Sequence, residues 1–333
     1  MHEETAARSH DEPSLGFIAT KPVQIMASLI LSRQLAPASS SLCVVPSFAD
    51  AAAVTRRLAV HAGTFKTVFA ARDRVRGLFA QAQHGHDVVF LDSDVGARTT
   101  AAMRLVHVLR PRLRFAVYEE GESLFHPLLQ ERPRRLFEML GATPTLGAGV
   151  LTSEVWTYAP EALRRRLPDA RLMRIEETLA AFVERERELL TSVFWPTIER
   201  DTRHWRGGRC LLYLSSWDVD PRGLTLLRAS SDFALFKPHP HIQDADAVAG
   251  GAANQVLSAA VPAELALFAL ARAFDEVVVL HHGSTTARYV SLPNVRFIHL
   301  DTYDAGRGSD AAVEIKGSGT DTKALADAGA FPR

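Results

Sequence analysis

Short apolar runs alternate with longer segments in which apolar residues recur at helical spacing along most of the chain. The runs that predict strands lie at residues 15–19, 41–46, 67–70, 87–91, 114–118, 211–214, 233–236, 276–280 and 295–299. Between them, segments such as 23–35 and 264–274 carry apolar residues along one helical face. This alternation is typical of parallel sheets covered by helices on both faces, so the pattern predicts an α/β fold.

The predicted strands fall into two groups. Five precede and four follow a stretch at 160–200 that the pattern predicts to be helical, and the sequence Arg206-Gly-Gly-Arg209 after it suits a hinge. We therefore expect two Rossmann-like lobes. The predicted boundaries are a flexible N-terminus at 1–14, a first lobe with a helical linker at 15–204, a second lobe at 205–302 and a loosely ordered tail at 303–333.

Composition narrows the class of protein. The 333 residues include 38 Lys and Arg and 38 Asp and Glu, so the formal net charge is zero and a wholly basic surface is excluded. An apolar fraction of 47% is typical of a globular protein and excludes a disordered chain. Cys43 and Cys210 both lie in apolar runs, which predicts buried thiols in a reducing compartment. No apolar run reaches the ~20 residues that span a bilayer, and the first residues lack the order of a signal peptide. The prediction is a soluble, cytoplasmic protein.

The chemistry of an open parallel sheet is expected at the carboxyl ends of its strands. Directly after the strand at 114–118 come Glu119, Glu120 and Gly121. A carboxylate on a tight turn is well placed to act as a general base, and mutual repulsion of two carboxylates raises the pKa of at least one. A solvated acidic turn that caps the next helix has the same pattern.

Two further loops follow strands of the second group. Lys237, Pro238, His239, Pro240 and His241 form a stiff, basic loop that suits a phosphate or a leaving group that needs a proton, although a rigid surface turn is the alternative.

The strand at 276–280 is followed by His281-His282-Gly283-Ser284-Thr285, whose hydroxyls and backbone N–H groups can bind an anion or simply cap a helix. The loop after the first strand, Thr20-Lys21-Pro22-Val23-Gln24, is a further candidate for the site, and an ordinary helix start with proline at its first position is the alternative. No dinucleotide or P-loop glycine motif occurs, so hydride transfer and P-loop phosphoryl transfer have no support.

An acidic pair with glycine, a His-Pro pair and a Ser-Thr pair occur in this order, each directly after a strand. In this the sequence resembles the bacterial polysialyltransferase and lipooligosaccharide sialyltransferase families of GT-B glycosyltransferases. The opening Phe17-Ile-Ala-Thr-Lys-Pro-Val-Gln24 and the helix start Val261-Pro-Ala-Glu264 are also similar, and the resemblance spans roughly residues 15 to 300. It implies a GT-B fold with two Rossmann-like lobes whose parallel sheets face a central cleft.

The resemblance also implies an activity, namely inverting transfer of sialic acid, or a related keto sugar acid, from a CMP-activated donor to a glycan hydroxyl. Glu119 would be the general base, with Glu120 second, and His239 would offset or protonate the charge on departing CMP. Gly121 would hold the turn. The donor phosphate and nucleotide would be bound by Lys237, Pro240, His282, Gly283, Ser284, Thr285, Ser215 and Glu264. Thr20, Gln24 and Asp94 would lie on the acceptor side. Because one imidazole and a helix start can meet the charge of one phosphate, we expect neither a metal nor another cofactor.

Other readings remain open. The Asp92-Ser93-Asp94 string matches the D-x-D of metal-dependent transferases, but we interpret it as a loop after a strand. A CDP-glycerol-type polyol-phosphate transferase would also carry a His-Pro loop, with a catalytic histidine expected in the first lobe. A degenerate, non-catalytic GT-B protein that binds a nucleotide or saccharide is the third reading. The basic clusters at 110–114 and 132–135 could hold an anionic acceptor or contact the inner membrane from the cytoplasmic side, and solvated helix ends are the alternative for each. We expect no nucleic-acid partner, and a homodimer through 176–190 is a further possibility.

Overall fold

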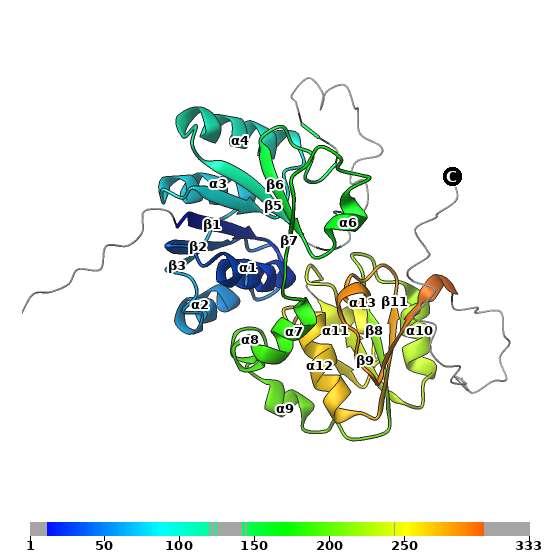
Figure 1. Ribbon diagram of the computed structural model, residues 1–333. Helices are drawn as coiled ribbons and strands as arrows, with labels where there is room; N and C mark the ends of the chain where they lie inside the picture. Colours follow the sequence, from blue (N-terminus) through cyan, green and yellow to red (C-terminus); the bar gives the residue numbers. More distant parts are fainter. Residues whose placement is uncertain are drawn as a thin grey trace, which may run out of the picture.

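Two parallel sheets, one from each half of the chain, form the framework of the protein (Figure 1). The computed structural model describes residues 12–119, 121, 124, 142–143, 145–242 and 244–302. Most of the N-terminal segment predicted to be flexible, and the tail at 303–333, lie outside the described residues.

The first sheet has the strand order β3-β2-β1-β4-β5-β6-β7, and every pair in it is parallel. Its strands are β1 (Ser14–Ala19), β2 (Ser39–Val44), β3 (Thr67–Ala70), β4 (Val88–Leu91), β5 (Arg114–Tyr118), β6 (Thr152–Thr157) and β7 (Leu172–Arg174). The chain winds outward from β1 in one direction and then returns to add β4 on its other side. This reversal opens a crevice beyond the carboxyl ends of β1 and β4, where ligands bind in open α/β sheets.

The second sheet repeats this topology with fewer strands, in the parallel order β10-β9-β8-β11-β12. Its strands are β8 (Arg209–Leu214), β9 (Phe233–Lys237), β10 (Gln255–Val256), β11 (Glu276–His281) and β12 (Val295–His299). The strand order reverses between β8 and β11, so the corresponding crevice lies beyond the ends of these two strands.

Helices cover both faces of each sheet. Around the first sheet lie α1 (Pro22–Leu35), α2 (Ala51–His61), α3 (Arg74–Gln83) and α4 (Ala97–Leu109). Around the second lie α10 (Pro221–Ala229), α11 (Ala245–Ala249), α12 (Ala263–Ala273) and α13 (Thr286–Tyr289), with a 3-10 turn, η2, at Leu300–Thr302. The two-residue period of a strand is visible in β8. Cys210, Leu212 and Leu214 face one apolar cluster, while Leu211 and Tyr213 face another.

The stretch at 160–200 differs from its prediction as one helical segment. It contains α6 (Pro160–Leu163), strand β7, α7 (Leu179–Arg185), α8 (Arg187–Phe194) and α9 (Ile198–Thr202). The periodic segment at 176–190 breaks at Glu186, which leaves the helical backbone region and whose carboxylate pairs with Arg33 and Arg185. The break lets α7 pack on α1 and α12 while α8 packs on α2.

One apolar layer runs through both halves of the molecule. It joins Phe17 and Ile25 of the first half, Phe182 and Val193 of the connecting helices, and Leu265 of α12 in a single cluster of buried residues. Both cysteines are buried thiols, as predicted. The predicted fold class, α/β with two parallel sheets, is confirmed. Among the described helices, none combines the length and apolar content needed to cross a membrane.

Candidate functional site: a cavity between the two sheets

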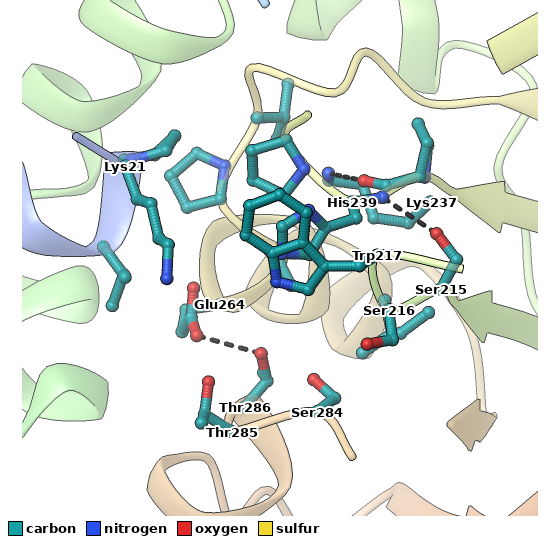
Figure 2. Close-up of a pocket in the computed structure, with 18 of the residues that line it drawn as sticks. Lys21, Ser215, Ser216, Trp217, Lys237, His239, Glu264, Ser284, Thr285 and Thr286 are labelled. Atoms are coloured by element: carbon teal, nitrogen blue, oxygen red, sulfur yellow. Dashed lines mark hydrogen bonds between the residues drawn. The ribbon is translucent and has the colours of Figure 1, made fainter. Parts of the chain in front are cut away.

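A cavity of about 270 Å³ lies where the reversal points of the two sheets meet (Figure 2). The first sheet contributes residues 21–23, after β1. The second contributes 214–217 after β8, 237–240 after β9, 261–264 at the start of α12 and 283–286 after β11. All are carboxyl ends of strands or helix N-termini, which is where an α/β protein is expected to hold a ligand.

Hydrogen bonds join the β8 and β9 loops into one wall of the cavity. The backbone N–H of His239 donates to Ser215 Oγ at 2.8 Å, and the N–H of Ser215 donates to the carbonyl of Lys237 at 3.1 Å. The Lys237 ammonium donates to the carbonyl of Pro238 in its own loop at 2.6 Å and to that of Ala259, in the segment before α12, at 3.3 Å. The position of the His239 ring is therefore set by two strand ends rather than by one flexible loop.

Lys237 and Glu264 form a buried pair of opposite charges that lines the cavity. They are 3% and 4% exposed. Burial lowers the pKa of Lys237 to about 7, with Glu264 acting in the opposite direction. Burial raises the pKa of Glu264, while the hydroxyl of Thr286, which donates to Glu264 Oε1 at 2.9 Å, and the charge of Lys237 lower it. A ligand charge placed beside Lys237, whose pKa lies near neutrality, can therefore change the protonation of this ammonium.

Three stacked rings stand at one side of the cavity. The Trp217 ring lies 4.1 Å from the His241 ring and 4.9 Å from the His239 ring, centroid to centroid, with interplanar angles of 16° and 31°. Trp217 is 61% exposed although it is the bulkiest residue type. Burial lowers the pKa of His239 to about 3, and the neighbouring charges of His241, Lys21 and Lys237 lower it further. The His239 imidazole is therefore neutral when the cavity holds no anion.

The acidic motif of the first sheet reaches the second sheet through Gly121. A Cβ on Gly121 would come within 2.8 Å of Thr285 Cγ2, so the two segments are in direct contact, and φ at Gly121 is +117°. Glu119 is 2% exposed. Its Oε2 accepts hydrogen bonds from the Thr157 hydroxyl and from the backbone N–H of Tyr158, the latter at 2.9 Å. Glu120 lies outside the described residues.

A second contact ties the His-Pro loop to the first sheet. The backbone N–H of Ala49, between β2 and α2, donates to the carbonyl of Pro240 at 3.0 Å. The loop that bears His239 is consequently fixed from both lobes.

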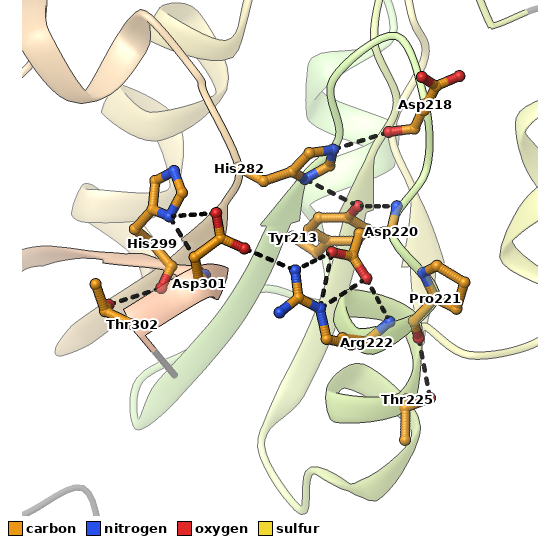
Figure 3. A network of polar contacts seen from close by, with 10 residues as sticks. All are labelled: Tyr213, Asp218, Asp220, Pro221, Arg222, Thr225, His282, His299, Asp301 and Thr302. Carbon is orange, nitrogen blue, oxygen red and sulfur yellow. Dashed lines mark hydrogen bonds and ion pairs between the residues drawn. The ribbon is translucent and has the colours of Figure 1, made fainter. Parts of the chain in front are cut away.

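Several predicted site residues have other partners. The His282 ring lies outside the cavity lining, where Nε2 is 2.9 Å from the carbonyl of Asp218 and Nδ1 is 3.4 Å from the Tyr213 hydroxyl (Figure 3). These contacts hold the segment that follows Trp217, so His282 positions that loop from outside the cavity lining. The Figure 3 network continues through Asp220 and Arg222 to Asp301.

The residues expected on the acceptor side are buried in the first lobe. Gln24 Oε1 accepts from the backbone N–H groups of Thr20 and Lys21, and the Thr20 hydroxyl donates to Asp92 Oδ2 at 2.9 Å. Asp94 accepts hydrogen bonds from the N–H groups of Gly147 and Gly149 and from the Thr152 hydroxyl. These three residues fix loops, and their role toward an acceptor stays a prediction. Asp92 forms a two-point pair with Arg74, both contacts being 2.6 Å.

The Ser-Thr pair differs in one respect from its prediction. Gly283, Ser284 and Thr285 do line the cavity, but the helix they begin, α13, is a single turn, so its dipole is small. The eleven-residue α12 directs its first turn at the cavity instead, with Glu264 in that turn. Sequence reasoning missed Trp217, because a lone aromatic in a loop carries no periodic or motif signal.

Comparisons with known proteins find solved structures that are similar to the chain, but no match to a protein family or a curated sequence. Among solved structures, it is similar to UDP-GlcNAc 2-epimerase from Neisseria meningitidis bound to UDP-GlcNAc (15% identity, 80% of this chain and 76% of that chain, TM-score 0.45). It is also similar to Glycyrrhiza uralensis UGT73P12 complexed with glycyrrhetinic acid 3-O-monoglucuronide (10%, 83% and 74%, TM-score 0.49). A third is E. coli ADP-heptose lipopolysaccharide heptosyltransferase II (11%, 86% and 90%, TM-score 0.37).

Proposed function

We propose that the protein is a GT-B glycosyltransferase that moves a sialic acid or related keto sugar acid from a CMP-activated donor to a hydroxyl of a bacterial surface glycan. The single observation that carries the proposal is the contact between Gly121 and Thr285. It brings the acidic turn of one lobe to the edge of a cavity that the other lobe lines with Lys237, His239, hydroxyls and backbone N–H groups. A transferase for an activated sugar needs this division between a base and a site for the leaving group.

The donor side is supported by the chemistry of the cavity. Ser284, Thr285 and the ammonium of Lys21 can meet a phosphate, and the carboxylate of Glu264 can accept hydrogen bonds from ribose hydroxyls. The exposed face of Trp217 offers a surface on which a nucleobase can stack. A nucleotide uses all three features, and CMP is the nucleotide that the proposal names.

His239 is the residue proposed to stabilise the negative charge that develops on the leaving phosphate. Its imidazole is neutral in the empty cavity because burial and nearby cations lower its pKa to about 3. A bound phosphate reverses the local field, so the ring can take up a proton and donate it as the C–O bond to CMP breaks. Chemistry of this kind requires no metal ion.

Glu119 is the proposed base, although its carboxylate lies almost entirely inside the protein. To reach an acceptor hydroxyl, it has to exchange the hydrogen bonds from Thr157 and Tyr158 for one to the acceptor. The role passes to Glu120 if those contacts are permanent. Direct comparison of E119Q with E120Q separates these assignments.

The proposal is tested by a donor screen with CMP-linked keto sugar acids, read as release of CMP. Hydrolysis of the donor reports its identity without knowledge of the acceptor. Turnover of one CMP-sugar, lost in H239A, supports the proposal. Absence of CMP release from every donor, with a purified and folded protein, contradicts it.

A thermal-shift panel gives an independent measurement. CMP is expected to raise the melting temperature, because a ligand that binds only the folded state stabilises it by RT ln(1 + [L]/Kd). Stabilisation by CDP or CDP-glycerol in preference to CMP assigns the cavity to a polyol-phosphate transferase. Binding of a nucleotide without turnover across a glycan panel assigns it to a non-catalytic binding protein.

A further inference from the structure

Helix α4 has apolar side chains on both sides. Its inner face, with Ala102, Met103 and Val106, packs into the apolar cluster under the first sheet. Its outer face carries Leu105 and Val108, with Leu109 at its end, and these are 51%, 76% and 65% exposed. They are three of the seven large apolar side chains that are exposed in the described part of the chain. A surface helix of a globular domain normally turns only one apolar stripe inward.

The exposed residues form one continuous strip. Positions 105, 108 and 109 are three and four residues apart, which places them on one side of the helix, and Ala101 lies one turn before them on the same side and is also exposed. In Figure 1, α4 lies at the outer edge of the first lobe, on the side away from the second lobe. No element of the described chain covers this face.

The charges around the strip have a single sign. Residues 95–118 include Arg98, Arg104, Arg110, Arg112 and Arg114, and no aspartate or glutamate. This is a concentration of positive charge in a chain whose net charge is zero. Two of these arginines have partners within the fold, since Arg110 donates to the carbonyl of Ala82 at 2.9 Å and Arg114 lies 3.7 Å from Glu154. Arg98, Arg104 and Arg112 are exposed beside the apolar strip.

We propose that the outer face of α4 docks on the surface of an anionic lipid bilayer. Leu105, Val108 and Leu109 enter the boundary between headgroups and acyl chains, and Arg98, Arg104 and Arg112 lie among the headgroup phosphates. An apolar strip flanked by arginines is the pattern of a helix that lies in a membrane interface. A lipid surface fits better than a protein partner, because the face offers apolar area and diffuse positive charge but no acidic side chain that would specify a partner. The inference is independent of the proposed activity.

Co-sedimentation of the full chain with vesicles tests the docking. We expect binding to vesicles of phosphatidylcholine mixed with phosphatidylglycerol, little binding to phosphatidylcholine alone, and release at high salt. L105S/V108S is expected to weaken the partition coefficient roughly tenfold or more. R104Q/R112Q is expected to weaken it by about fivefold for each arginine at low salt. These side chains are exposed, so the melting temperature is expected to stay unchanged.

A matched control lies on another helix of the same lobe. Arg56 and Val60 of α2 are also an exposed arginine and an exposed valine, and R56Q/V60S should bind vesicles like the unmodified chain. The proposal is overturned if phosphatidylglycerol vesicles do not bind the protein at low salt, or if the α4 and α2 variants bind equally. It is also overturned if L105S/V108S converts a dimer to a monomer in light scattering without changing lipid binding, because the face then belongs to a second copy of the chain.

Discussion

Gly121 of the first lobe lies directly against Thr285 of the second, at a distance that leaves no room for a Cβ. The contact joins the acidic turn after β5 to the Ser-Thr loop after β11. Two constraints therefore act on one residue: φ is +117°, which disfavours any L side chain, and the space is occupied by a methyl group of Thr285.

We expect G121A to lower the free energy of unfolding by roughly 1–3 kcal/mol, because both constraints act together. Adding T285S, which removes the methyl group but not the backbone constraint, should restore part of the loss. Urea unfolding measures both variants. A methyl group added at Gly63 would meet no atom within 4 Å, and the backbone there has no positive φ, so G63A is the control and should change stability little. Equal effects at the two glycines would show that the contact with Thr285 carries no energy.

The general base is tested by E119Q. Glutamine keeps an oxygen that can accept from Thr157 and Tyr158, so we expect the fold to persist while kcat for glycosyl transfer falls by about 10²–10⁴. E154Q is the control, because Glu154 is a mostly buried carboxylate of the same sheet, paired with Arg114 and Arg171, and its glutamine variant keeps an oxygen that can accept the hydrogen bond from Trp156 Nε1. A lower melting temperature with unchanged activity of the folded fraction would make Glu119 a structural residue.

Lys237 predicts a pH dependence of stability. Its pKa falls from 10.5 to about 7 on folding, so between these values the folded protein binds fewer protons than the unfolded chain. The free energy of unfolding therefore rises with pH in this window, by up to about 1.4 kcal/mol per pH unit. Below about pH 7, where Lys237 is charged in both states, burial of its charge destabilises the folded protein by the full amount. K237M should flatten the rise in urea unfolding measured from about pH 7 to pH 9. The exposed Lys66 supplies a control, and a K237M curve that runs parallel to that of K66M would refute the assignment.

His239 predicts that nucleotide binding takes up a proton. The pKa of the ring is about 3 in the empty cavity, and a phosphate beside it favours the charged form. CMP should therefore bind more tightly as the pH falls toward the higher pKa that the ring has in the complex with CMP. Calorimetric titration near pH 6, in buffers of different ionisation enthalpy, measures the proton uptake, which H239N should remove. H61N, at the end of α2, should leave it intact. Binding heats that are independent of the buffer would mean that the ring keeps its neutral form.

Trp217 predicts a fluorescence signal for the ligand. It is 61% exposed, whereas Trp156, Trp195 and Trp205 are at most 6% exposed. Stacking of a base on its free face should quench the emission, and W217A should weaken binding by about 1–3 kcal/mol. W217F removes the signal and keeps an aromatic surface, so it separates loss of the reporter from loss of affinity. Quenching that persists in W217F would place the ligand elsewhere.

The sequence predicts most of the fold because its central strands are apolar on both faces. All nine predicted strands are present within a residue or two, but β6, β7 and β10 were not predicted. β7 and β10 are edge strands of three and two residues, and β6 begins Thr152-Ser153-Glu154, so none has the apolar run of a central strand. Pairing with a neighbouring strand, rather than local preference, makes these segments extended.

The site was predictable as far as it depends on strand ends. The loops with Lys237, His239 and Ser284 lie around one cavity because two sheets with the same winding place their reversal points there. Burial of individual carboxylates was not predictable, because it depends on partners far away in the chain. Glu119 meets Thr157, and Asp94 meets the loop at 147–152, only after the sheet has formed.

The apolar layer shared by both lobes has a consequence for how such a molecule can be divided or recombined. Phe182 of α7 and Leu265 of α12 belong to the same buried cluster as Ile25 of α1. A half expressed alone would expose its side of this layer to water, and a half exchanged with that of another protein would meet a surface of the wrong shape. We therefore expect the two lobes to unfold together, in a single calorimetric transition rather than as separable modules.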